Sequence, residues 1–173
     1  STPASAATRS RARSARPSRR ASRRVLNERL IKVDVEVEDW RNCAREAGNL
    51  LVKEGLVKPE YIDLMIETVE EFGPYMILVP KVCFFHGKPG EYVHQPCLSL
   101  ITLKNEVRFT EFDNQPIRCA FAFGATDSDS HLGLIQNIAK ILSDEEFIEL
   151  ITTNGKKEKI LEKIERMESN EAH

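Results

Sequence analysis

The stretch "IRCAFAFGATDSDSHLGLIQNIAKIL", residues 117–142, indicates the fold class because its periodicity changes half-way along. Residues 117–125 are almost continuously apolar, as in a buried strand. After the polar segment 126–130, a stripe at helical spacing begins, formed by His131, Leu134, Ile135, Ile138 and Leu142. A buried strand that leads into an amphipathic helix is typical of an α/β layer structure.

Further strands are expected on the N-terminal side of this stretch. Residues 33–39 alternate apolar and acidic side chains, which is typical of a half-buried strand or an extended lead-in. Short apolar runs predict buried strands at 75–79, 82–85 and 97–103, and residues 107–112 predict a short edge strand. With residues 117–125, these segments predict a mixed sheet of about four to five strands.

Two helices are predicted before the main strand region. The first begins at Trp40 with Asp39 as its N-cap and ends at Gly55. The second opens at Pro59 and stops at Gly73, and its buried face carries Tyr61, Met65, Val69 and Phe72.

Helical periodicity also continues after residue 142. Ser143 and Glu146 have the spacing of a capping box, and a last helix is expected at about 155–168, with inward-facing Ile160, Leu161, Ile164 and Met167. The order of elements predicts a single α/β domain whose mixed sheet is flanked by helices. Functional residues in such folds gather where strands end and helices begin.

The first 24 residues differ in composition from the rest of the chain. They are rich in arginine, serine and alanine and contain eight arginines but no acidic residue. We expect residues 1–24 to be a disordered tail and residues 25–173 to form the domain. A remnant of recombinant expression, a transit-like peptide and a nucleic-acid-binding arm would all fit the tail. The first is favoured because the composition changes abruptly and the chain does not begin with Met.

The composition of the domain excludes several classes of protein. Without the tail it carries 17 basic and 27 acidic residues, a formal charge of about −10, which argues against nucleic acid as its partner. No apolar run of about 18 residues is present, so no membrane span is expected. The cysteines form no CxxC pair and lie mostly in apolar runs, which favours a reducing, cytoplasmic compartment; they are Cys43, Cys83, Cys97 and Cys119.

Two histidines lie at predicted element junctions. His86 ends the strand in "VCFFHGKPG", residues 82–90, and His131 begins a helix. A helix start favours anions and a neutral histidine is a usable nucleophile, so the two together suit phosphoryl transfer. Spacing alone favours structural roles, with His86 as a buried or capping residue and His131 on an apolar helix face. His94 is expected to be a solvated loop residue.

A zinc site is a third possibility for His86, because Cys83 and His86 have C-x-x-H spacing. Side chains alternate along a strand, so residues 83 and 86 should point to opposite faces. No second ligand pair at zinc spacing follows, and an apolar setting raises the pKa of a thiol. We therefore expect no metal, no cofactor and no cysteine nucleophile.

Three segments, 39–90, 98–109 and 120–142, carry motifs in a defined order. They are the helix end "EEFGPY", the His-Gly-x-Pro turn at 86–89 and the later "DSHL" at 129–132. In this combination the domain resembles the type-2 enzyme IIA (EIIA) domain of the bacterial sugar phosphotransferase system (PTS), the fructose–mannitol class. Within that class it is most similar to the ascorbate-type subfamily, over roughly residues 37–165.

The resemblance implies a phosphate relay. His86 matches the histidine that accepts phosphate from the histidine-containing phosphocarrier protein, HPr, and passes it to a cysteine of the cognate EIIB. The membrane component EIIC and the sugar lie one step further on. His131 matches the histidine that helps to hold the phosphate, and Gly87 the small residue that lets the backbone approach it. Lys88 matches a frequent basic residue or is simply solvated, and Pro89 would stiffen the turn.

One departure concerns the two residues before the nucleophile. Most relatives have Leu-Pro or Ile-Pro there, whereas this chain has Phe84 and Phe85. We expect Phe85 to replace the proline as an apolar lid beside the His86 ring and to contact a partner. The partner surface should be shallow and apolar around His86, with charged rims.

A regulatory function is the main alternative. The same domain occurs in transcriptional regulators and in nitrogen-linked signalling, where its phosphorylation is a switch. The relay is favoured here because no regulatory domain is seen beside the match. A binding protein with a vestigial site is a further alternative. The transported sugar and the oligomeric state stay open at this stage.

Overall fold

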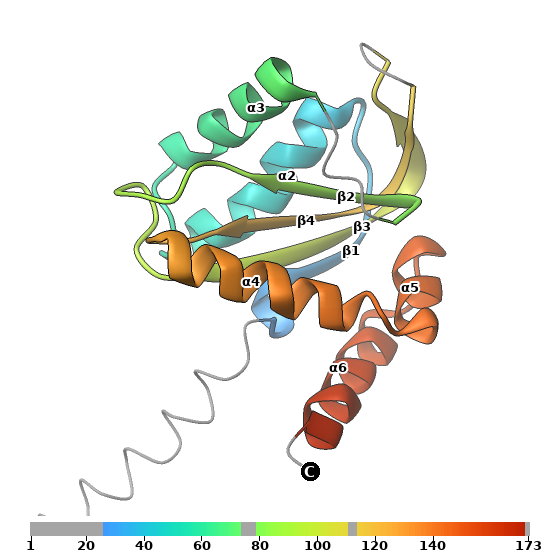
Figure 1. Ribbon diagram of the computed structural model, residues 1–173. Helices are drawn as coiled ribbons and strands as arrows, with labels where there is room; N and C mark the ends of the chain where they lie inside the picture. The colour runs from blue at the N-terminus through green and yellow to red at the C-terminus, as the bar shows by residue number, and fades with distance from the viewer. Residues whose placement is uncertain (1–25, 74–78, 111–113, 172–173) are drawn as a thin grey trace, which may run out of the picture.

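The computed structural model describes residues 26–73, 79–110 and 114–171. A short 3-10 helix, η1 (Glu28–Leu30), leads into strand β1 (Ile31–Val35), and helices α2 (Trp40–Lys53) and α3 (Glu60–Phe72) follow. The remaining strands are β2 (Lys81–His86), β3 (Cys97–Arg108) and β4 (Pro116–Gly124), and the last helices are α4 (Ser128–Ile141), α5 (Glu145–Thr152) and α6 (Lys157–Glu171). The chain forms the single α/β domain that the sequence predicts (Figure 1).

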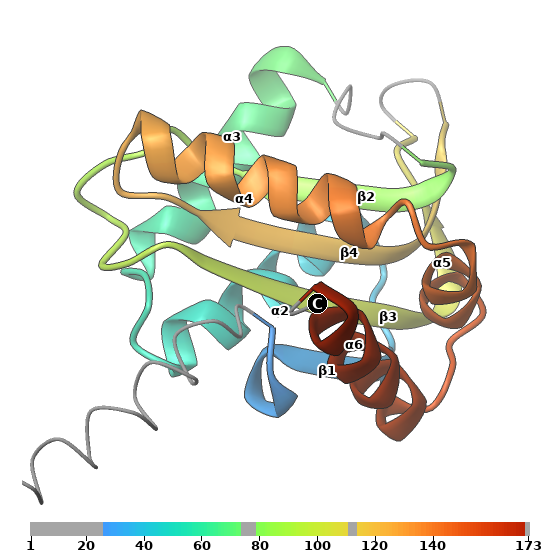
Figure 2. The same cartoon turned by 60° about the horizontal axis from the view of Figure 1, so that its bottom comes forward.

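The four strands of the described residues form one mixed sheet in the order β1-β3-β4-β2. β1 is parallel to β3 and β2 is parallel to β4, whereas β3 and β4 are antiparallel. Helices α2 and α3 cover one face, and α4, α5 and α6 lie on the other (Figures 1 and 2). Because β2 and β4 are parallel neighbours, their carboxyl ends meet at one edge, where α4 also begins.

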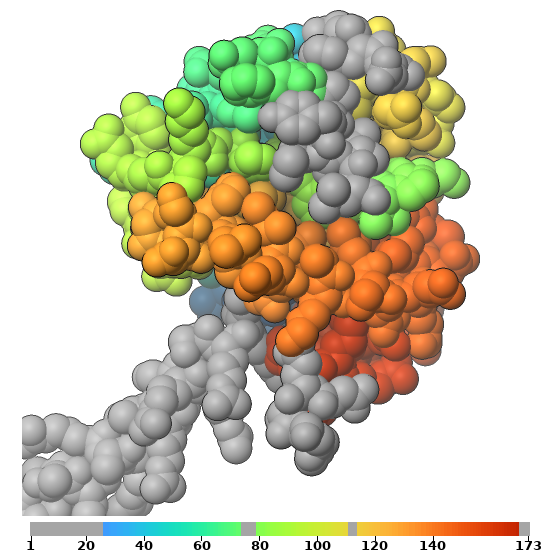
Figure 3. Space-filling model, viewed as in Figure 1, coloured from blue at the N-terminus to red at the C-terminus, as the bar shows by residue number. Residues whose placement is uncertain are grey.

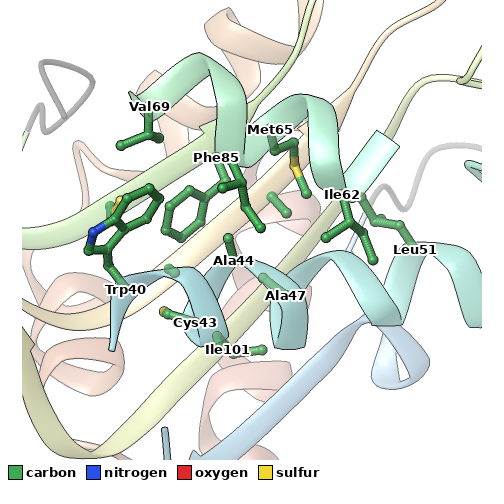
Figure 4. Packing of buried hydrophobic residues seen from close by; sticks show 14 of the residues in the cluster. Trp40, Cys43, Ala44, Ala47, Leu51, Ile62, Met65, Val69, Phe85 and Ile101 are labelled. Carbon is green, nitrogen blue, oxygen red and sulfur yellow. The ribbon is translucent and has the colours of Figure 1, made fainter. Parts of the chain in front are cut away.

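The two faces of the sheet have separate hydrophobic cores. Alternation along β2 sends Cys83 and Phe85 into the core beneath α2 and α3, and Val82 and Phe84 into the core beneath α4 to α6. In the first core, Trp40, Ala44 and Ala47 of α2 pack near Met65 and Val69 of α3 and near Phe85 (Figure 4). All four cysteines are free and buried, which confirms that they behave as small core residues.

The helix boundaries follow the predicted signals with two exceptions. Asp39 caps α2 as predicted, by accepting a 2.8 Å hydrogen bond from the Asn42 amide. Phe72 was expected on the buried face of α3 but is 54% exposed at the last position of that helix. The predicted capping box of Ser143 and Glu146 is wrong.

Asp144 is the residue that caps α5. Its carboxylate accepts a 2.9 Å bond from the Phe147 amide, while the Ser143 hydroxyl donates back to the Lys140 carbonyl of α4. A capping box occurs instead at the start of α4, where Asp127 and Ser130 bond to each other's backbone amides. This box fixes the position of the first turn of α4.

Three strand predictions also change. The strand expected at 33–39 begins and ends earlier, as β1 (Ile31–Val35), so residues 36–39 form the connection to α2. Residues 107–108 are not a separate edge strand but the end of β3, which is longer than predicted and is interrupted by a bulge before Val107. Of the predicted strand 75–79, residues 75–78 lie outside the described part, and Val79 forms an isolated bridge with Val82. The tail 1–24 also lies outside it. No helix among the described residues is long and apolar enough to cross a membrane.

Candidate active site

Three aromatic rings meet at the edge where β2 and β4 end. His86 is the last residue of β2, and the parallel pairing places it directly beside Phe123 of β4. The two rings stack with their centroids 4.9 Å apart and an interplanar angle of 20°. Phe123 therefore provides a flat apolar surface for the imidazole of His86.

His131 reaches the same cluster from the first turn of α4. Its ring centroid lies 5.5 Å from that of His86 and 5.6 Å from that of Phe123. The segment after β2 and the start of α4 lie side by side on the molecular surface (Figure 3). The structure thus brings together the two histidines that the sequence singled out.

Burial controls the charge of His86. Its pKa is lowered from the ordinary histidine value, chiefly because burial disfavours the charged ring and then because His131 is nearby; the backbone of Gly87 opposes the shift. The Nδ1 atom is buried and makes no hydrogen bond of good geometry. The ring is therefore neutral near pH 7, the state in which histidine is a nucleophile.

Gly87 is held by a tyrosine that the sequence placed only in the core. The Gly87 amide donates a 2.8 Å hydrogen bond to the hydroxyl of Tyr61 in α3, and that hydroxyl donates a 2.7 Å bond to the Phe123 carbonyl. A Cβ at position 87 would lie 2.7 Å from Cγ of Leu64. Close contact with α3 thus favours glycine at this position, a reason that the sequence did not indicate.

The missed residues carried a weak signal in the sequence. A buried tyrosine needs a hydrogen-bond partner, so Tyr61 on the apolar face of a predicted helix could have been flagged. Which partner it finds depends on the docking of α3 against the sheet. Phe123 stood in an unbroken apolar run, where nothing distinguished it from core residues.

The remaining predicted site residues lie around the turn that follows His86. Lys88 is exposed, and Pro89 is partly exposed. His94 is exposed in the loop before β3, where its amide donates to the Leu56 carbonyl, so the prediction of a solvated loop residue is confirmed.

The expectation for Phe85 is wrong. Its side chain is 0% exposed and packs in the core beneath α2 and α3, on the opposite face of the sheet from His86. It can neither cover the imidazole nor contact a partner, because strand alternation directs it away. Phe84 is the residue on the His86 face, and it stacks on Phe121 with centroids 5.3 Å apart.

The same alternation separates Cys83 from His86. Cys83 lies in the core on the Phe85 side, and burial raises the pKa of its thiol well above the ordinary value. Burial also raises the pKa of Cys97 to about 12. The thiols are therefore protonated, and Cys83 cannot share a metal ion with His86.

Comparison with known proteins identifies the family. The family described as "Phosphoenolpyruvate-dependent sugar phosphotransferase system, EIIA 2" matches residues 24–167. The chain belongs to this family. The predicted resemblance to PTS EIIA domains is confirmed.

Individual relatives agree with the assignment. The ascorbate-specific PTS EIIA component of Escherichia coli K12 is 31% identical over 144 residues, which cover 82% of this chain and 93% of that protein. A Streptococcus mutans structure assigned as a PTS IIA (PtxA) has a TM-score of 0.73 at 30% identity, covering 81% and 89% of the two chains. This EIIA domain is thus a component of a sugar transport phosphotransferase system, and its relatives include ascorbate-specific members.

A solved complex shares the fold. In the E. coli complex of the mannitol enzyme IIA with phosphorylated enzyme IIB, a chain matches this EIIA domain with a TM-score of 0.68 at 24% identity. The match covers 79% of this chain and 94% of that one. At this identity the likeness shows the common architecture of the EIIA domain.

Proposed function

We propose that this EIIA domain carries phosphate on His86 as a relay in the cytoplasm. It accepts the phosphoryl group from phosphorylated HPr and passes it to a cysteine of a cognate EIIB, which serves the membrane component EIIC. The observation that carries the proposal is the neutral His86 ring on Phe123 with His131 beside it. A neutral imidazole with a second histidine in contact suits a nucleophile whose phosphorylated form needs stabilisation.

Burial selects the ring nitrogen that reacts. Because Nδ1 of His86 is buried, Nε2 is the nitrogen that a phosphorylated partner can reach. Nε2 attacks phosphorus, the nitrogen–phosphorus bond of the donor histidine breaks, and the donor ring keeps that electron pair. In the second transfer an EIIB thiolate attacks phosphorus, and the bonding pair returns to Nε2 of His86.

His131 is the group placed to stabilise the phosphate. The start of α4 has a partial positive charge, but the carboxylate of Asp127 already accepts the Ser130 amide there. A second anion at the helix terminus would therefore meet a negative charge. The side chain of His131, which contacts the His86 ring, can donate a hydrogen bond to the phosphoryl oxygens without that penalty.

The surface around the site supports a transient protein partner. Leu132, which follows His131 in the sequence, is 56% exposed. Two charged residues are also exposed, Lys88 two positions after His86 and Asp129 two positions before His131. An apolar residue with charged neighbours suits an interface that forms and separates quickly. The IIA–phosphorylated IIB complex of the mannitol system, which contains the same fold, supports EIIB as the second partner. The ascorbate-specific relatives support an ascorbate-like carbohydrate.

One assay tests the relay. The protein is incubated with phosphoenolpyruvate, enzyme I and HPr, and the phosphate is located by mass spectrometry. We expect label on His86, none in the His86→Ala variant, and wild-type labelling in the control His94→Ala. Wild type without label would overturn the proposal. Label on His86 that no ascorbate-type EIIB can accept would instead favour the regulatory switch.

A further inference from the structure

Tyr61 occupies a special position between the two strands that form the site. A Cβ on Gly87 would lie 3.2 Å from Cε1 of Tyr61, and one on Gly124 would lie 3.3 Å from its Cε2. Gly87 directly follows β2, and Gly124 ends β4. The tyrosine ring is thus packed closely against both strand ends, where a larger residue than glycine would crowd it.

The hydroxyl of Tyr61 joins the same two strand ends. It accepts from the Gly87 amide at 2.8 Å and donates to the Phe123 carbonyl at 2.7 Å; its oxygen lies 3.4 Å from the Gly87 carbonyl. Tyr61 is 0% exposed, so these bonds form away from water. They connect the residue that follows His86 to the residue on which His86 stacks.

We propose that Tyr61 is a positioning residue of the phosphotransfer site: its hydroxyl holds the Gly87 amide and the Phe123 carbonyl together and so fixes the His86 ring on Phe123. This inference rests on the proposed function of His86. The inference also makes the Tyr61 hydroxyl the hydrogen-bond acceptor of the Gly87 amide. The amide is therefore already bonded within the protein and is not a donor to the phosphate.

Loss of the hydroxyl should loosen the site in a defined way. In Tyr61→Phe the Gly87 amide and the Phe123 carbonyl lose a common partner, so the residue after His86 gains freedom and water can approach the ring. Burial is the main cause of the lowered pKa of His86, so better hydration should raise that pKa. A misplaced nucleophile should also transfer phosphate more slowly, by about tenfold or more.

The matched control is Ser99→Ala. Ser99 is also fully buried, and its hydroxyl donates a 2.7 Å bond to the Ala47 carbonyl of α2, on the face of the sheet away from His131. Both variants lose one buried hydroxyl and should unfold at a lower temperature. Only Tyr61→Phe should slow phosphotransfer from HPr and raise the His86 pKa, measured by NMR titration of the imidazole signals well below the unfolding temperature.

The outcomes separate this inference from the proposed function. If the wild-type protein is not labelled on His86, the proposed function is overturned. Labelled wild type with a Tyr61→Phe variant that keeps both the wild-type transfer rate and the wild-type His86 pKa overturns the inference alone and leaves Tyr61 as a packing residue.

A second measurement uses the wild-type protein and does not depend on the folding of any variant. The amide proton of Gly87 is followed by NMR before and after phosphorylation with phosphoenolpyruvate, enzyme I and HPr. We expect it to stay protected from hydrogen exchange and to shift little, because Tyr61 remains its acceptor. A strong downfield shift of the Gly87 amide, as in a new bond to the phosphate, would contradict the proposal.

Discussion

The rings of His86 and His131 lie with their centroids 5.5 Å apart and tilted by 59°. Two imidazolium ions at this distance would repel each other, so the neighbouring ring disfavours protonation of His86. Burial already lowers the pKa of His86, and the proximity of His131 lowers it further. This arrangement favours a neutral His86 ring. In the proposed relay, the negative charge of a phosphoryl group on His86 would then favour a hydrogen bond from His131.

The first prediction concerns His131. In His131→Ala the His86 pKa should rise, because the electrostatic effect of His131 on the His86 ring is gone, yet stay below the ordinary histidine value because burial remains. Phosphotransfer should fall on the order of 10²-fold, the usual effect of removing one stabilising donor. NMR titration of the His86 ring and the labelling rate from HPr measure both effects. His94→Ala, which changes an exposed histidine, is the control. An unchanged His86 pKa would mean that the two rings are not coupled.

The lowered pKa of His86 also predicts a loss of stability in acid. The unfolded chain binds a proton at the ordinary histidine pKa, whereas the folded protein binds it only at lower pH. Between these values the unfolded state holds more protons, so the free energy of unfolding falls as the pH decreases through that window. His86→Gln should lose less stability than wild type between pH 7 and pH 5 in urea titrations. Equal losses would show that His86 is as easily protonated when folded as when unfolded.

Sequence patterns predicted the parts of the fold that depend on local periodicity. The change of period after residue 125 located β4 and α4, and alternation correctly separated Cys83 from His86. Local signals were less reliable at boundaries, as at Ser143, because two adjacent polar residues compete to cap the same helix. Phe72 has the helical spacing of the buried residues but is exposed, because periodicity alone does not determine which positions at a helix end are covered.

Sequence analysis could identify only those site residues that lie at the junctions between strands, loops and helices. His86 and His131 could be proposed together because each lies where a strand or helix begins or ends. The roles of Phe123 and Tyr61 depend on the pairing of β2 with β4 and on the docking of α3, which are long-range properties. The same cause explains the error at Phe85: the resemblance suggested a residue beside the ring, but the register of β2 directs it into the opposite core.

A third prediction tests the aromatic surface beneath His86. Phe123→Leu should keep the fold but remove the stacking that orients the imidazole, so phosphotransfer should slow and the His86 ring signals should shift or broaden. Phe121→Leu is the matched control, because Phe121 lies two residues earlier on the same face and stacks on Phe84 instead. Each variant should lose about 0.5–1.5 kcal/mol of aromatic pairing. If Phe121→Leu slows transfer as much as Phe123→Leu, the surface acts through stability alone.

Gly87 provides the fourth prediction. In Gly87→Ala the new methyl group meets Cγ and Cδ2 of Leu64 at 2.7 and 2.8 Å, so either the Leu64 side chain or the end of β2 must shift. We expect a loss of about 1–3 kcal/mol in the free energy of unfolding, as for overpacked cores, together with slower phosphotransfer. Gly90→Ala, where a Cβ has no neighbour within 4 Å, should leave transfer unchanged.

Truncation of Leu64 identifies the clash. The double variant Gly87→Ala with Leu64→Ala should recover part of the transfer rate relative to Gly87→Ala, because the shorter side chain at position 64 leaves space for the new methyl group. Strictly additive losses in this cycle would place the effect of Gly87→Ala in the turn itself and not in its contact with α3.

The fifth prediction concerns the connection between the sheet and the last two helices. Asn154, between α5 and α6, donates a 2.7 Å bond to the Asp34 carboxylate, and its side-chain oxygen accepts from the Asp34 amide and the Thr102 hydroxyl. Asp34 and Asn154 have φ values of 57° and 54°, which asparagine and aspartate tolerate better than most residues. A carboxamide is required at 154 only for the bond to Asp34, since a carboxylate could accept the other two.

Asn154→Asp therefore changes one interaction and leaves the backbone preference intact. Two carboxylates would face each other at the 2.7 Å contact, and the lost charge-assisted bond should cost about 1–3 kcal/mol in the free energy of unfolding. The exchange of both residues, Asp34→Asn with Asn154→Asp, restores one amide facing one carboxylate and should recover most of this loss. Because the pair lies at β1, at the opposite edge of the sheet from β2, His86 labelling should be unaffected in the folded variants. A double variant no more stable than Asn154→Asp would show that the Asp34 contact does not hold α6 against the sheet.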